Sequence, residues 1–194
     1  MATVAGVCLS PAAALAASDD ALPLIELPGH VEAPDFVLPD LLGAAHRLSD
    51  YRGQPVLISF WAVWCPPCRR ELPSLAGLNA RLKDASIAVL ALNLGDGPER
   101  VGAFLADHPS PGLPILLGQS ATGDAWHVQG LPVAYAIDAY GILRLGAIGE
   151  RDWETPSIER QLRTLSEAAP RRPSPVQPIV VRSRSRRGLA QLVL

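Results

Sequence analysis

The sequence has few of the residues that hold metal ions. Its 194 residues include three cysteines and four histidines, and the histidines are scattered without the spacing of a ligand set. Structural zinc normally takes four ligands, and only Cys65 and Cys68 are close together in the chain. Haem attachment needs a histidine directly after the second cysteine, where this chain has Arg69. We therefore expect no bound metal and no organic cofactor.

A glycine-rich phosphate loop and a serine-hydrolase motif are also missing. Residues 1–170 carry 11 basic and 19 acidic side chains, whereas residues 171–194 carry six arginines and no acidic residue. Because the larger part of the chain is acidic, we expect no nucleic-acid partner. The tail, residues 170–194, is rich in proline, arginine and serine, a composition typical of disordered or solvated segments.

The N-terminal 17 residues are apolar and uncharged. They end near Ala14-Leu15-Ala16, and they resemble the apolar and cleavage parts of a signal peptide that lacks its basic start. The run is too short, and too interrupted by Pro11, to span a bilayer. We expect an exported protein, periplasmic or otherwise extracytoplasmic, with membrane association through an uncleaved leader as an open alternative. Residues 18–32 are predicted to be a linker, and residues 33–169 the folded domain.

Apolar runs and amphipathic stretches alternate through that domain. The pattern predicts strands at 56–62, 87–94, 114–117, 134–138 and 142–148, and helices from the cysteines onward and at 98–108, 121–128 and 156–168. Short apolar segments on either side of Gly43 predict a small hairpin before them. Together they predict an α/β domain: a central mixed sheet flanked by helices on both faces, with an N-terminal β-hairpin extension.

Cys65-Pro66-Pro67-Cys68 lies where the first buried strand meets the next helix. Prolines are tolerated in a first helical turn, so Cys65 is expected at the helix N-terminus and Cys68 one turn later. Free amide hydrogens and the partial positive charge of that terminus favour thiolate over thiol. Cys65 is therefore the expected nucleophile, with Cys68 resolving the mixed disulfide. A static disulfide or half of a zinc site remains the alternative.

The sequence around this motif is similar to the thioredoxin superfamily. Trp64 precedes the first cysteine, Phe60-Trp61-Ala62 comes before it, and Glu71-Leu72-Pro73 follows. More narrowly, the chain resembles the extracytoplasmic TlpA-like thiol–disulfide oxidoreductases. Its lead-in, residues 34–53, is similar to the one that these proteins share with peroxiredoxins of the AhpC/TSA type. The resemblance covers about residues 33–169 and implies a thioredoxin fold.

The resemblance also implies roles for residues near the cysteines. Pro132 is expected to follow a cis peptide bond and to face the motif, since such bonds are realistic only before proline. Leu131 would then offer its backbone to an extended substrate segment. Trp64, Pro66 and Pro67 are expected to complete the substrate-binding surface.

Glu71 lies one helical turn after Cys68, and the resemblance implies that it acts as a general acid or base toward that thiol. A solvated helix glutamate is the alternative. Cytoplasmic thioredoxins place a buried aspartate six residues before the first cysteine, where this chain has Ser59. Because a hydroxyl cannot accept a proton at neutral pH, the case for Glu71 is stronger.

These residues predict a thiol–disulfide oxidoreductase whose redox group is the Cys65–Cys68 disulfide. The resemblance implies a monomeric reductase of exported proteins, in cytochrome c maturation or a similar assembly pathway, supplied by an electron-donating dithiol protein that can be membrane-bound. A peroxiredoxin-like peroxidase is one alternative, although no threonine lies close before Cys65. A copper chaperone using Cys65 and Cys68 is another, although no histidine or methionine is well placed to assist it.

Overall fold

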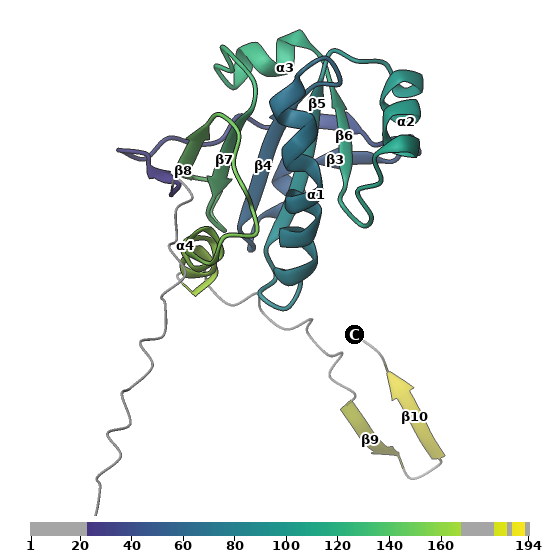
Figure 1. Ribbon diagram of the computed structural model, residues 1–194. Helices are drawn as coiled ribbons and strands as arrows, with labels where there is room; N and C mark the ends of the chain where they lie inside the picture. Colours follow the sequence, from purple (N-terminus) through teal and green to yellow (C-terminus); the bar gives the residue numbers. More distant parts are fainter. Residues whose placement is uncertain (1–22, 168–180, 186–187, 193–194) are drawn as a thin grey trace, which may run out of the picture.

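The computed structural model describes residues 23–167, 181–185 and 188–192, and the predicted leader lies outside them (Figure 1). A six-stranded sheet with the order β1-β8-β7-β4-β5-β6 forms its centre. Its strands are β1 (Ile25–Glu26), β4 (Val56–Trp61), β5 (Ala88–Leu94), β6 (Ile115–Gly118), β7 (Val133–Ile137) and β8 (Leu143–Ile148). β4 runs parallel to β5 and antiparallel to β7, so the sheet is mixed, as predicted.

Helices cover both faces of this sheet. They are α1 (Pro66–Arg81), α2 (Pro98–Asp107), α3 (Ser120–Ala125), α4 (Pro156–Glu167) and the single 3-10 turn η1 (Leu48–Tyr51). One apolar cluster joins α1, α2 and α4 to the sheet, and the other joins η1 and the residue after α3, Trp126, to the opposite face. Figure 1 shows α1 lying along the sheet in front of β4 and β5. The predicted thioredoxin-like architecture is confirmed.

β4 is the centre of both clusters because every one of its side chains is buried. Successive side chains of a strand point to opposite faces. Leu57 and Trp61 therefore pack toward α1, whereas Ile58 and Phe60 pack toward the other cluster. The continuous apolar run in the sequence is the consequence of this double burial.

The lead-in forms the predicted hairpin. β2 (Val37–Pro39) pairs with β3 (Ala45–Arg47) in antiparallel register, and Gly43 between them has a φ of 84°. An isolated bridge from Asp40 to Leu116 ties the hairpin to β6.

One segment differs from the sequence-based expectation. The predicted linker contains β1, which pairs with β8, and Leu24 just before it is buried. Gln161 of α4 holds the backbone of Leu24 by accepting from its N–H and donating to its C=O, both at 3.0 Å. This pairing could not be predicted from the sequence, because the segment is rich in proline and glycine and a strand of two residues leaves no pattern to recognise.

The predicted tail, residues 170–194, contains two of the described strands. β9 (Val181–Ser185) and β10 (Gly188–Leu192) pair in antiparallel register. Composition weighs charge and proline content, whereas a two-stranded ladder needs only backbone N–H and C=O groups in register.

Candidate active site

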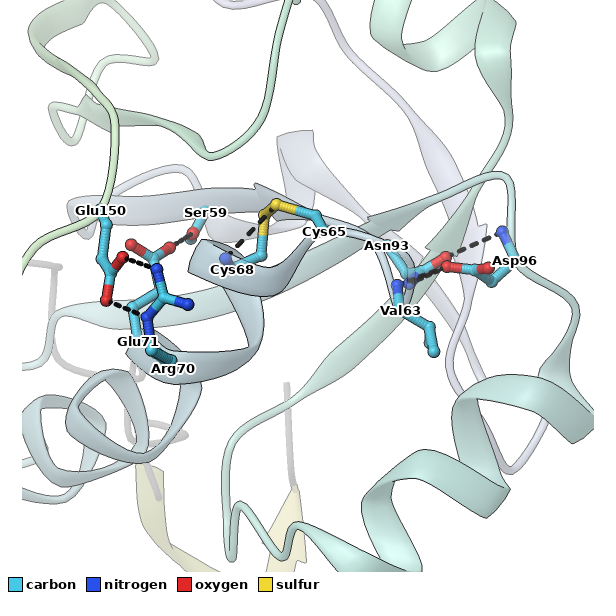
Figure 2. The surroundings of a disulfide bond; sticks show 9 residues. All are labelled: Ser59, Val63, Cys65, Cys68, Arg70, Glu71, Asn93, Asp96 and Glu150. Carbon is cyan, nitrogen blue, oxygen red and sulfur yellow. Dashed lines mark hydrogen bonds and ion pairs between the residues drawn. A yellow bond between two sulfur atoms is a disulfide. The ribbon is translucent and has the colours of Figure 1, made fainter.

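The two cysteines lie at the junction of β4 and α1, as the motif predicts. After β4, the chain turns through Ala62–Cys65, and this turn is closed by a hydrogen bond from Cys65 N–H to the Ala62 C=O at 3.1 Å. Cys65 caps α1, whose first two residues are prolines, and its Sγ accepts from the Cys68 N–H at 3.3 Å. Cys65 and Cys68 are joined in a disulfide (Figure 2).

The two cysteines of the motif are buried, whereas the neighbouring Trp64 is exposed. Cys65 is 3% exposed and Cys68 is completely buried, whereas Trp64 is 62% exposed. Pro66 is exposed and Pro67 half-buried. An approaching molecule therefore meets Trp64 and Pro66 first, and of the two cysteines only Cys65 reaches the surface at all.

Glu71 comes one turn after Cys68 on α1 and is only 2% exposed, so the alternative of a solvated helix glutamate is wrong. Its Oε1 accepts a hydrogen bond from Ser59 Oγ at 3.0 Å. Burial raises the pKa of Glu71 from its usual 4.5 to about 7, against the opposing effects of the Ser59 hydroxyl and of the backbone and guanidinium of Arg151. The carboxyl group thus changes its charge near neutral pH, next to the dithiol.

The loop after β8 covers this carboxyl group. It contributes Arg151 and Trp153, both buried, and the Trp153 indole also favours the charged form of Glu71 and so opposes the rise in its pKa. Figure 2 shows Arg70 of α1 pointing to Glu150 in the same loop. Arg70 Nε donates to Glu150 Oε1 at 2.8 Å, which holds the loop against the helix.

Pro132 lies at the same end of the sheet as the cysteines. The Leu131–Pro132 peptide bond is cis, as predicted. β7 runs antiparallel to β4, with Val133 opposite Phe60. Pro132 therefore lies level with Trp61, which precedes the Ala62–Cys65 turn. Leu131 is half-buried and packs against both apolar clusters.

Comparison with known proteins decides the family, because the AhpC/TSA family matches residues 30–145 of this chain. The chain belongs to the AhpC/TSA family. This family member is 39% identical to the thiol-disulfide oxidoreductase ResA of Geobacillus kaustophilus over 134 residues, which cover 69% of this chain and 75% of that protein. It is also 33% identical to the thioredoxin-like protein YneN of Bacillus subtilis over 129 residues, covering 63% and 75% of the two chains.

Solved structures agree with this membership. A Chlorobium tepidum protein assigned as the thiol:disulfide interchange protein DsbE superposes with a TM-score of 0.65 at 31% identity, covering 72% of this chain and 99% of that one. The exposed lipoprotein thioredoxin Etrx1 of Streptococcus pneumoniae gives 0.59 at 26% identity, covering 69% and 99%. With its Cys65–Cys68 disulfide, this AhpC/TSA-family protein is a thiol–disulfide oxidoreductase.

Two other properties of the described residues bear on this AhpC/TSA-family enzyme. In the part of the chain that the structure describes, no group of three or more His, Cys, Asp or Glu residues could hold a metal ion. Within the same residues, no helix combines the length and the apolar character needed to cross a membrane.

Sequence reasoning missed two contacts in this AhpC/TSA-family site. The first is the hydrogen bond that Ser59 Oγ donates to Glu71 Oε1. The signal was available, because Ser59 is the only polar residue of β4 and alternation places it on the face that carries Leu57 and Trp61, toward α1. The second missed contact joins Asp96, which follows β5, to the turn before Cys65, and no local pattern indicates it.

Proposed function

We propose that this oxidoreductase acts outside the cytoplasm and reduces disulfides of exported proteins, in cytochrome c maturation or a similar assembly pathway. The observation that carries the redox cycle is the asymmetry of the disulfide: Cys65 caps α1 and reaches the surface, while Cys68 is completely buried. The signal-peptide-like start of the sequence and the similarity to an exposed lipoprotein thioredoxin support the location.

In the reduced enzyme, the Cys65 thiolate attacks one sulfur of a substrate disulfide. The substrate S–S bond breaks, one substrate sulfur leaves as a thiolate, and the other is joined to Cys65 in a mixed disulfide. The Cys68 thiolate then attacks Cys65 Sγ, which releases the second substrate thiolate and forms the Cys65–Cys68 disulfide. Two electrons have passed to the substrate, and a dithiol protein restores the enzyme by the reverse exchange.

Glu71 supplies the proton transfer that this cycle requires. Cys68 is completely buried, so its thiol needs a base close by before it can attack. Glu71 lies one turn later on α1, and its pKa of about 7 lets it accept and release a proton near neutral pH. The Ser59 hydroxyl donates to Glu71 and thus orients the acceptor, whereas in cytoplasmic thioredoxins an aspartate occupies the Ser59 position.

The substrate is bound by the residues around Cys65. Trp64 and Pro66 are exposed and Pro67 is half-buried beside them. Leu131 and Pro132 lie at the same end of the sheet, where the backbone of Leu131 pairs with an extended substrate segment. Trp64 and Pro66 thus offer a protein substrate an exposed contact surface beside Cys65, which is itself only 3% exposed.

The decisive experiment is covalent trapping with Cys68→Ala. This variant keeps the nucleophile and lacks the resolving thiol, so Cys65 should remain disulfide-bonded to exported proteins, which non-reducing gels and mass spectrometry identify. Cys65→Ala is the matched control and should trap nothing. The opposite pattern, with Cys65→Ala trapping and Cys68→Ala free, would reverse the two roles.

The direction of electron flow has its own readout in the same preparation. The equilibrium of the wild-type dithiol with a dithiothreitol redox buffer gives the reduction potential. We expect a reducing value on the thioredoxin side of the scale, about −270 mV. A value close to that of strong oxidants such as DsbA, about −120 mV, would contradict the reductase role.

A further inference from the structure

Asp96 is a buried carboxylate that belongs to neither the dithiol nor the Glu71 site. It follows β5, and its side chain is 3% exposed. Its Oδ2 accepts from the Val63 N–H at 2.7 Å and from Asn93 Nδ2 at 3.1 Å, and its Oδ1 pairs with Arg100 Nε at 3.2 Å. Burying a charge is costly unless such partners compensate it.

Asn93 braces this carboxylate from below. Asn93 is the last residue of β5 that pairs with β4, opposite Trp61, and it is completely buried. Its amide group makes two contacts with Asp96: Nδ2 donates to the carboxylate, and Oδ1 accepts from the Asp96 N–H at 3.0 Å. The position of the carboxylate is therefore tied to the end of the central strand pair.

The hydrogen bond from the Val63 N–H to Asp96 lies just beyond the last residue pair of β4 and β5, Trp61 and Asn93. β4 ends at Trp61. The chain then separates from β5 and turns through Ala62–Cys65, so the Val63 N–H has no partner in a neighbouring strand. A half-buried N–H of this kind must find an acceptor, and the acceptor here is a carboxylate, which makes a stronger bond than a neutral group. Figure 2 shows Asn93, Asp96 and Val63 on one side of the disulfide and Ser59 and Glu71 on the other.

We propose that Asp96, braced by Asn93, is a positioning residue that fixes the Ala62–Cys65 turn, so that Trp64 and Cys65 meet a protein substrate in one fixed arrangement. This role rests on the proposed function, in which Trp64 binds the substrate. The capping contact between Cys65 Sγ and the Cys68 N–H is made at the N-terminus of α1 and does not involve Asp96. The intrinsic reactivity of Cys65 is thus separate from the orientation of Trp64.

This separation gives a test with two disulfides of different size. Ellman's reagent, a small aromatic disulfide, needs only Cys65, whereas a peptide with an oxidised Cys-Xaa-Xaa-Cys-His segment, the haem-attachment sequence, also needs the surface around it. For Asp96→Ala, we expect the KM for the peptide to rise about tenfold, the effect of losing one hydrogen bond to a charged group. The kcat and the rate with Ellman's reagent should change less than about twofold.

Asp96→Asn is the conservative variant, and it also serves if Asp96→Ala does not fold. Its amide oxygen can still accept from Val63, so most of the lost affinity should return. Glu99→Ala, which removes an exposed carboxylate of the neighbouring helix α2, is the matched control and should match the wild type in both assays.

Three outcomes contradict the assignment. An unchanged KM for the peptide in Asp96→Ala would show that the turn is held without the carboxylate. An equal loss with both disulfides would place Asp96 in thiol chemistry or in the fold. A wild-type enzyme that reduces Ellman's reagent but not the peptide would overturn the proposed function, and this role of Asp96 with it.

Discussion

Replacing Glu71 by glutamine should stabilise the oxidised protein at pH 8 far more than at pH 5. Glu71 is almost completely buried, and its pKa rises from 4.5 to about 7 on folding. Between these two values the unfolded chain has lost the proton and the folded protein still holds it. The free energy of unfolding therefore falls as the pH rises through this window, by about 1.4 kcal/mol per pH unit and about 3 kcal/mol in all.

The glutamine side chain in Glu71→Gln would have the same shape without the charge. Its amide oxygen can still accept from Ser59, and no carboxylate has to be buried at high pH. We expect the stability advantage of Glu71→Gln to be about 2–3 kcal/mol larger at pH 8 than at pH 5. Because wild type and variant share every other titrating group, the difference between them isolates Glu71.

Denaturant unfolding of both proteins at several pH values measures this difference. The disulfide must stay closed, so no reductant is added. Glu99→Gln provides the control, since Glu99 is exposed on α2 and its replacement should leave the stability profile unchanged. A stability difference between Glu71→Gln and wild type that stays constant from pH 5 to pH 8 would refute the reasoning, because it would mean that Glu71 titrates alike in the folded and unfolded states.

Two further predictions concern the partner of Glu71 and a glycine of β6. Ser59→Ala removes a donor that favours the charged form of Glu71, so the pKa of Glu71 should rise further and the pH–rate profile of the dithiol should move to higher pH, except in the Glu71→Gln background, where no shift is expected. Gly118→Ala should destabilise the fold by about 1–3 kcal/mol in thermal unfolding, because its Cβ would lie 2.7 Å from Leu92 Cδ2 and 3.1 Å from the Asn93 carbonyl oxygen. Gly102→Ala is its control: nothing lies within 4 Å of that Cβ, and alanine favours the helix.

The sheet and the dithiol junction could be predicted because their signals are local. An unbroken apolar run indicates a strand buried on both faces, and the spacing of apolar residues after Cys68 indicates one helix face. Cys68, Leu72, Leu75 and Leu78 are indeed buried on α1. Each of these conclusions needs only neighbours within one or two turns of the chain.

The contacts that tune the site depend on elements distant in sequence. Asp96 reaches Val63 across 33 residues, and this depends on the parallel register that sets Trp61 opposite Asn93. The pKa of Glu71 likewise depends on the loop after β8, because Arg151 and Trp153 of this loop favour the charged form and oppose the rise that burial causes. Periodicity carries no information on how such loops settle, so the sequence indicated Glu71 as a candidate without indicating its burial.

Because β1 is part of the central sheet, the folded domain begins before the hairpin. It lies at the outer side of β8, where an open strand would present unpaired N–H and C=O groups to another molecule. Leu27 follows β1 and fills the space above Gly146, where a side chain would meet Leu27 Cδ2 at 3.2 Å. Cutting the chain at Ala33 would uncover this border of the sheet and favour self-association through β8. The short segment before the hairpin is therefore part of the folded domain, because it covers the edge of β8.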